Sequence, residues 1–192
     1  MKELYNIGVV ILSAGESSRM NTPKSFLKYD LNRRFIDKII DEYKNIRINK
    51  IVVVVNKRDF DKLNLQDNIS VCINEHLEYE RFYSIKLGLE KIEDCDFCYI
   101  QNIDNPFVND VILRNLYFKR NINGSTVPVY NERGGHPVLI GQDVINRIRK
   151  TNGSILNFKE LLSEFPCNRI EIDDESILRN INSPEDYKKY FN

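Results

Sequence analysis

The chain has 192 residues, of which 42% are hydrophobic and 29% charged, as is ordinary for a globular protein in water. Its 28 lysines and arginines balance 28 aspartates and glutamates, so no overall charge would attract nucleic acid or an anionic membrane. The N-terminal residues lack a signal-peptide layout, and no apolar run reaches the ~20 residues of a membrane span. We therefore expect a cytoplasmic protein.

The first predicted element is a buried strand that ends at Ser13 and runs into a loop of small and basic residues. Such a loop leaves backbone N–H groups unpaired, and with Arg19 and Lys24 it suits a polyphosphate. An ordinary surface turn is the alternative. The two familiar phosphate loops do not match. A Walker loop has Gly where Pro23 stands, and the dinucleotide fingerprint needs three glycines where this loop has only Gly15.

Apolar runs then alternate with segments of helical periodicity, which indicates an α/β domain with a largely parallel sheet. A continuous β-branched run at 51–55 is typical of a central strand buried on both faces. The other predicted strands are 70–73, 97–100, 126–130, 137–140 and 168–172. The predicted helices are 34–43, 79–92, 109–118, 143–149, 158–165 and one from Pro184, with loops at 30–34 and 172–180. No repeat or linker is present, so we predict one domain over residues 1–192.

The predicted helix at 79–92 carries two polar residues near its start. Arg81 and Ser84 are three positions apart and therefore share one face of the helix. From the residues alone they are either ligand contacts or a solvated helix end, since charged residues are common near helix termini.

Cys95 and Cys98 have C-x-x-C spacing just before the predicted strand at 97–100. A zinc site would need a second ligand pair, and the only histidines, His76 and His136, form no spaced pair. A thioredoxin-type site would place its first cysteine at a helix N-terminus, whereas this pair leads into a strand. We therefore expect both cysteines to pack as small buried apolar residues.

Asp104 follows the same strand, at the edge of the sheet where ligands of α/β proteins bind. One carboxylate is enough to hold Mg²⁺, which otherwise keeps waters and phosphate oxygens as ligands. The alternative is an aspartate that caps the next helix or forms an Asx turn before it.

The first loop resembles the L-A-A-G-x-S-x-R-M-G-x-P-K signature of nucleotidyltransferases with a glycosyltransferase-A-like fold. It is most similar to the molybdenum-cofactor cytidylyltransferase group of the MobA-like NTP transferases. Ser13 replaces the usual alanine, and Asn21 replaces the usual glycine, which adopts positive φ more freely. Ala14 and Pro23 favour a cytidylyltransferase, because related guanylyltransferases usually have Gly and Asp at these two positions.

Four later segments also resemble motifs of this family. Residues 81–89 are similar to R-x-x-S-x-x-x-G-L, and Asp104 with Pro106 matches D-x-P. Residues 135–139 are similar to G-H-P-V-L, although a glycine pair before a strand is also an ordinary turn signal. Residues 180–186 are similar to D/N-x-[DN]-T-P-E-D, although a cap, a proline and acidic residues also mark any helix start.

The resemblance spans most of the chain and implies a single Rossmann-like, three-layer α/β domain with a mostly parallel sheet. It implies Mg²⁺-dependent transfer of CMP from CTP to a molybdopterin-type phosphate, with release of pyrophosphate. The catalytic residues would be Lys24, Asp104 and Arg19. The nucleotide-binding residues would be Leu12, Ser13, Ala14, Gly15, Ser17, Arg19, Lys24, Arg81 and Ser84. The metal would be held by Asp104 and Asn182, with Asn180 as a substitute for the latter, and the acceptor would contact Gly135, His136 and Pro137.

Two other functions stay open. The first is a nucleotidyltransferase that acts on a sugar phosphate or another small phosphorylated acceptor. The second is a non-catalytic chaperone that binds a nucleotide or the pterin cofactor and delivers it to a partner, for which docking to a molybdoenzyme is one possibility. A nicotinamide dehydrogenase fits less well because the glycine fingerprint is missing. The leading hypothesis requires that Lys24 and Arg19 share one cleft with Asp104.

Overall fold

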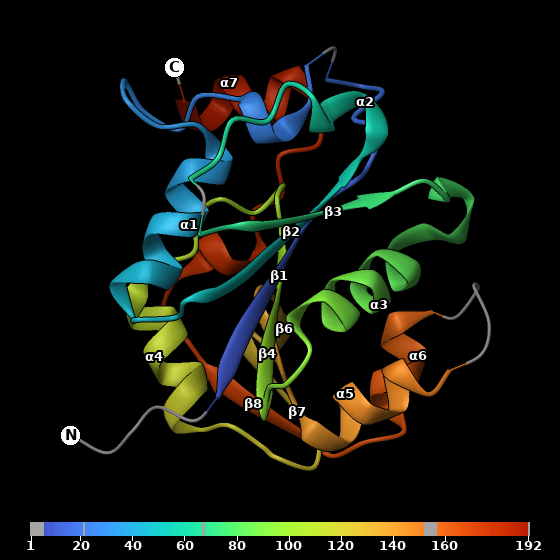
Figure 1. Cartoon of the computed structure of the whole chain (residues 1–192). Coiled ribbons are helices and arrows are strands. Elements are labelled where there is room, and N and C mark those ends of the chain that lie inside the picture. Colours follow the sequence, from blue (N-terminus) through green and yellow to red (C-terminus); the bar gives the residue numbers. More distant parts are fainter. Residues whose placement is uncertain (1–5, 21, 67, 152–156, 192) are drawn as a thin grey trace.

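The computed structural model describes residues 6–20, 22–66, 68–151 and 157–191. One eight-stranded sheet forms its centre, with the order β3-β2-β1-β4-β7-β5-β6 and β8 paired to β5 (Figure 1). The strands are β1 (Ile7–Ser13), β2 (Lys50–Asn56), β3 (Ser70–Asn74), β4 (Phe97–Asn102), β5 (Ser125–Tyr130), β6 (Arg133–Gly134), β7 (Val138–Gly141) and β8 (Cys167–Glu171).

Helices cover both faces of this sheet (Figure 1). In this view α1 (Phe35–Asn45) and α4 (Asp110–Phe118) lie to the left of the sheet. To the right lie α3 (Glu80–Ile92), α5 (Gln142–Arg149) and α6 (Phe158–Ser163). At the top lie α2 (Lys57–Phe60) and α7 (Pro184–Phe191). Three short 3₁₀ turns complete the list: η1 (Lys24–Phe26), η2 (Leu77–Tyr79) and η3 (Glu175–Leu178). Among the described residues, no helix is long and apolar enough to cross a membrane.

The sheet is mostly parallel, as predicted. β1 pairs in parallel with β2 and β4, and β2 pairs in parallel with β3. β7 runs antiparallel to both β4 and β5. Every residue of β1 is buried, and successive side chains enter opposite layers: Val9 and Ile11 join the core under α1 and α4, whereas Val10 and Leu12 join the core under α3 and α5. The predicted three-layer α/β class is confirmed.

Helix α3 lies very close to β1 because Gly88 has no side chain. A Cβ atom at this position would lie 2.4 Å from Val10 Cγ1, closer than carbon atoms approach in a packed core. The contact brings the first turn of α3, with Arg81 and Ser84, towards the carboxyl end of β1, where the first loop begins.

The predicted elements are present, and the structure adds several that sequence reasoning missed. The segment 172–180, predicted to be a loop, contains η3 because Asp174 Oδ1 accepts a hydrogen bond from Ser176 N–H (2.9 Å) and Ile177 is buried. The short helix α2 begins directly after β2, because the Asn56 side chain caps it. The last predicted helix before β8 ends at Ser163, two residues early.

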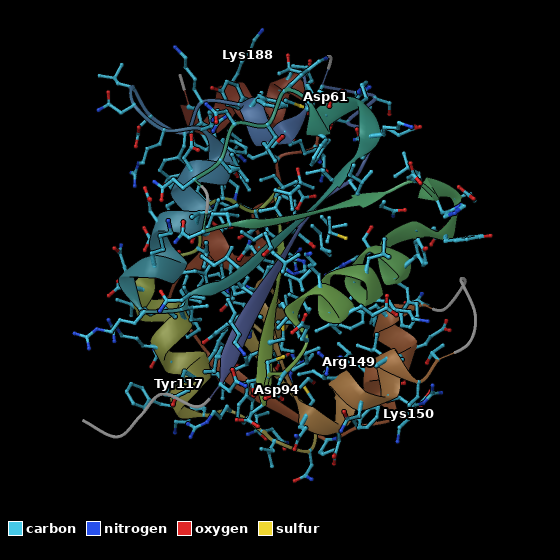
Figure 2. All side chains as sticks on the ribbon, viewed as in Figure 1. Asp61, Asp94, Tyr117, Arg149, Lys150 and Lys188 are labelled. Atoms are coloured by element: carbon cyan, nitrogen blue, oxygen red, sulfur yellow. The ribbon has the colours of Figure 1, made fainter. Side chains whose placement is uncertain are left out.

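Cys95 and Cys98 are buried at the amino end of β4, which confirms that they pack as small apolar residues. Asp94, next to Cys95, lies in the lower half of Figure 2, whereas Asp61, which follows α2, lies near the top. Burial raises the pKa of the Cys98 thiol. Because Cys95 and Cys98 lie at the amino end of β4 and Asp104 follows its carboxyl end, the two cysteines lie at the opposite end of this strand from Asp104.

Candidate active site

A cavity of about 910 Å³ lies where β1, β3 and β4 end. It is bounded by the first loop, η2, the start of α3 and the residues after β4. Its lining includes most of the residues predicted to bind the nucleotide or the metal, namely Leu12, Ala14, Gly15, Ser17, Lys24, Arg81, Ser84 and Asp104. Two predicted nucleotide-binding residues of the first loop are not part of this lining: Ser13, whose side chain is buried at the end of β1, and Arg19. Parallel strands therefore deliver these residues to one edge, as the fold class requires.

The first loop turns back at Ser17, which has a positive φ of 52°. Two hydrogen bonds close the turn: Met20 N–H donates to Ser17 O at 2.9 Å, and Lys24 N–H donates to Ser17 Oγ at 3.4 Å. Glu80, at the other side of the cavity, also has a positive φ of 56°. Left-handed backbone in residues other than glycine is unfavourable and gathers at functional sites. Asn21, where the family usually has glycine, lies outside the described residues.

The closest group of predicted site residues is formed by Lys24, Asp104 and Asn182. Lys24 Nζ donates to Asn182 Oδ1 at 2.6 Å and lies 3.5 Å from Asp104 Oδ2. These partners are 158 and 80 positions away in the chain. The side chains of Lys24 and Asp104 are 14% and 23% exposed, so they remain accessible to a ligand. Of the expectation that Lys24 and Arg19 share one cleft with Asp104, the structure meets the part on Lys24, whereas Arg19 is exposed and lies outside the cavity lining.

The segment that carries Asn182 is tied to the end of β4 through hydrogen bonds. Ile181 N–H donates to the main-chain oxygen of Asp104 at 2.8 Å. The buried amide of Asn105 donates to three main-chain oxygens, those of Ser176 (3.1 Å), Ile177 (3.3 Å) and Arg179 (2.8 Å). Sequence reasoning assigned no role to Asn105. It holds the polar 172–182 segment against the sheet and so places Asn182 beside Asp104.

We expect Asn105→Ala to lower the free energy of unfolding by about 1–3 kcal/mol, because buried carbonyl groups lose their donor. Urea-induced unfolding measures this change. Asn115→Ala on the exposed side of α4 is the matched control and should leave the unfolding midpoint unchanged. An unchanged midpoint in Asn105→Ala as well would contradict the anchoring role.

Arg19 is placed differently from Lys24. Its side chain is exposed and is not part of the cavity lining. Its charge instead acts on Asp186, whose pKa is lowered chiefly by the hydrogen bond from Asn182 N–H and to a smaller extent by Arg19. The structure thus brings Arg19 near the start of α7 but not into the cavity. Asn180 is also exposed, so Asn182 is the asparagine of this motif that contacts Lys24.

Asn74 and Asn102, which sequence reasoning gave no role, hold other site residues in place. Asn74 Nδ2 donates to Ser84 Oγ at 2.9 Å, which joins the end of β3 to α3. Asn102 Nδ2 lies 3.1 Å from His136 Nε2, which joins the end of β4 to the G-H-P segment. Both residues line the cavity, and each is the last residue of a strand. A polar residue at the carboxyl end of a strand is the sequence signal that could have identified them. Three glutamates also line the cavity, namely Glu16, Glu78 and Glu80.

The predicted acceptor contacts lie beside the cavity. A Cβ atom on Gly135 would lie 2.6 Å from Ile177 O, so only glycine permits this approach to η3. His136 N–H then donates to the same Ile177 oxygen at 3.0 Å, and Pro137, which follows, is buried. Burial, with a contribution from the charge of Arg81, lowers the pKa of His136 to about 4, so its ring is neutral at neutral pH.

The residues at the end of β4 fit a divalent cation. Asp104 Oδ1 is buried, and among the described residues it has no hydrogen-bond partner. A carboxylate oxygen in this position is unfavourable when unpaired, and carboxylate and amide oxygens are the donors that Mg²⁺ takes. Asp104 and Asn182 could therefore hold Mg²⁺ together with water and phosphate oxygens. The described residues contain no group of three or more His, Cys, Asp or Glu side chains that could do so alone.

Similarity to known proteins extends over most of the chain. A sequence profile of the MobA-like NTP transferase domain matches residues 9–163. A 2-C-methyl-D-erythritol 4-phosphate cytidylyltransferase from Fusobacterium nucleatum is 33% identical over 113 residues, which are 53% of this chain and 47% of that protein. The matched part is therefore about half the length of this relative.

Two further comparisons cover nearly the whole chain. A molybdenum cofactor guanylyltransferase from Campylobacter jejuni is 27% identical over 202 residues, which cover 98% of this chain and 97% of that protein. The crystal structure of molybdopterin-guanine dinucleotide biosynthesis protein A from Archaeoglobus fulgidus has a TM-score of 0.71 at 18% identity, covering 95% of this chain and 96% of that one. The structural likeness shows a shared fold.

Proposed function

This chain belongs to the MobA-like NTP transferase family, and we propose that it transfers CMP from CTP to the phosphate of a molybdopterin-type cofactor and releases pyrophosphate. The observation that carries the proposal is the meeting of Lys24 and Asp104, which line the cavity, with Asn182, whose side-chain oxygen accepts a hydrogen bond from Lys24. A volume of about 910 Å³ is within the range of small-molecule sites, large enough for a nucleoside triphosphate.

Transfer at this site depends on the alignment of the two substrates and on positive charge around phosphorus more than on a proton acceptor. An oxygen of the acceptor phosphate attacks the α-phosphorus, the bond to the β-phosphate oxygen breaks, and pyrophosphate leaves with that electron pair. A phosphate nucleophile is already anionic at neutral pH, so no general base is required. The acceleration then comes from alignment and from neutralising the charge around phosphorus.

Lys24 is suited to hold the α-phosphate. Its ammonium group has three donors, and Asp104 and Asn182 fix its position at the cavity wall. Main-chain N–H groups of the first loop, around Ala14 to Ser17, can cradle the remaining phosphates. Asp104 and Asn182 are the residues that would hold Mg²⁺, which when bound would supply Lewis-acid stabilisation of the phosphate oxygens.

CTP as donor is supported by Ala14 and Pro23 in the first loop and by the cytidylyltransferase relative. The pterin-type acceptor is supported by the match at residues 135–139 and by the molybdenum cofactor relative, which aligns over almost the entire chain. Because that relative is a guanylyltransferase, GTP is the second candidate donor.

We expect pyrophosphate release from CTP to exceed that from GTP by at least about tenfold in kcat/KM, which is ~1.4 kcal/mol of discrimination. The assay offers each of the four nucleoside triphosphates with Mg²⁺ and molybdopterin and couples pyrophosphate to a colour reaction. Equal or faster use of GTP would contradict the assignment based on Ala14 and Pro23.

The same assay separates the other functions when the acceptor is varied. Release that occurs only with sugar phosphates or small alcohol phosphates would replace the pterin acceptor and keep the reaction type. Calorimetry that detects nucleotide binding without pyrophosphate release for any acceptor would favour a chaperone that carries the nucleotide or cofactor. In that outcome, docking to a molybdoenzyme becomes the interaction to test.

A further inference from the structure

A guanidinium group at the cavity wall has buried donors without partners. Arg81 lies in the first turn of α3, and its Nε and Nη2 atoms are buried. Within residues 6–20, 22–66, 68–151 and 157–191 neither atom has a hydrogen-bond partner. Burial lowers the pKa of Arg81, yet a guanidinium stays charged at neutral pH. A charged group buried without an acceptor is unfavourable, and a bound anion would remove that penalty.

The surroundings of Arg81 define where such an anion would lie. The ring of Phe158, from α6, is 5.5 Å from the guanidinium carbon and supports its plane from one side. The charge of Asp104 raises the pKa of Arg81, and the charge of Arg81 in turn lowers the pKa of His136. Arg81 is therefore close enough to act electrostatically on both the predicted metal ligand and the predicted acceptor contact.

His136 adds a further donor. Asn102 Nδ2 is a donor only, and it lies 3.1 Å from His136 Nε2, so that ring nitrogen accepts and the proton is on Nδ1. His136 Nδ1 is buried, and no hydrogen-bond partner for it occurs in the described part of the chain. Two elements far apart in sequence thus present unpaired N–H groups beside one cavity.

Resting on the proposed function, we infer that Arg81 and His136 bind the phosphate monoester of the acceptor, the group that attacks, and not the triphosphate of the nucleotide. In the proposed function, Lys24 and the first loop already provide the contacts for the triphosphate. Arg81 lines the cavity together with Asn102, whose side-chain amide lies 3.1 Å from His136 Nε2. Its planar fork of N–H groups matches two oxygens of a phosphate.

The test uses the full-length protein with two probes, inorganic phosphate and a CTP analogue with a methylene group between the α- and β-phosphates. The analogue occupies the nucleotide site without transfer. Calorimetry measures binding of the analogue, and the ¹⁵N shift of His136 Nδ1 measures binding of phosphate to the analogue-loaded protein. We expect saturable phosphate binding that perturbs this nitrogen.

Arg81→Met should weaken phosphate binding by at least about tenfold and change the dissociation constant of the analogue by less than about twofold. Arg114→Met, on the exposed surface of α4, is the matched control and should change neither. Lys24→Ala should show the reverse pattern: binding of the analogue should weaken, and binding of phosphate should change little. If Arg81→Met instead weakens binding of the analogue and leaves phosphate binding unchanged, the inference is wrong and the proposed function stands.

A structural role for Arg81 makes a different prediction about stability. Removal of a buried charge without a partner should leave the melting temperature of the ligand-free protein unchanged or higher. A lower melting temperature with normal phosphate binding would overturn the inference. Should Arg81→Met fail to fold, His136→Leu, which removes the Nδ1 donor, must weaken phosphate binding or the inference fails. Wild-type protein that binds phosphate but no analogue would contradict the proposed function alone.

Discussion

Lys24→Ala is expected to lower kcat by about 10²–10³-fold, the loss seen when one preorganised donor to a developing charge is removed. Lys24 Nζ is held 2.6 Å from Asn182 Oδ1 and 3.5 Å from Asp104 Oδ2, so its position is set before substrate arrives. In the proposed reaction this ammonium group neutralises charge on the α-phosphate as pyrophosphate leaves. Pyrophosphate release at saturating CTP, Mg²⁺ and acceptor measures the effect.

The controls for Lys24 separate charge, shape and folding. Lys28→Ala removes an exposed lysine four residues further along the chain and should keep kcat within about twofold of wild type. Lys24→Arg keeps the charge but replaces a compact ammonium with a larger planar group, so we expect only partial activity. Circular dichroism should show the same fold for all three variants. A folded Lys24→Ala protein with wild-type kcat would remove this residue from the mechanism.

Asp104→Asn is expected to abolish most metal binding in the nucleotide complex and to lower kcat/KM by about 10²-fold or more. Asp104 is the carboxylate of the predicted metal pair, and Asn182 supplies only a neutral amide oxygen. The substitution preserves the shape of the side chain but removes its charge. Mn²⁺ binding in the presence of the CTP analogue, followed by electron paramagnetic resonance, gives a readout that does not depend on turnover.

Asp110, a half-exposed residue in the first turn of α4, provides the matched change. Asp110→Asn should bind Mn²⁺ with wild-type affinity, because this carboxylate lies outside the cavity. Equal Mn²⁺ affinity in Asp104→Asn and wild type would contradict the ligand assignment. In that case the buried oxygen Asp104 Oδ1 would need another partner.

Local patterns were sufficient to predict the longer strands and helices and their order, although α2, β6 and the 3₁₀ turns were missed. The β-branched run at 51–55 predicted a strand buried on both faces, and β2 is such a strand. The small and basic residues after β1 predicted a loop at the ligand-binding edge of the sheet, and this loop lines the cavity. That it binds an anion stays a prediction. Strand and loop were predictable because periodicity and turn chemistry act over a few residues.

Contacts between distant polar residues were not predictable in the same way. The segment 172–180 reads as a polar loop, yet the Asn105 amide and the burial of Ile177 order it as η3 against the sheet. Arg19 and Lys24 occur in the same loop with the same charge, yet the turn at Ser17 is followed by Lys24 in the cavity and Arg19 on the surface. Residue type alone does not predict which of the two basic residues lines the cavity and which lies on the surface.

The amino-acid sequence by itself determined the α/β class and predicted Lys24 and Asp104 as site residues, which the structure brings together at one cavity. Only the tertiary structure decided that Asn182 lies against Lys24, that Asn102 orients His136, and that Arg81 is buried with unpaired donors. The physical reason is that the hydrogen-bond partners of a side chain depend on which strand ends lie side by side. The order of the strands is set by the packing of the whole sheet.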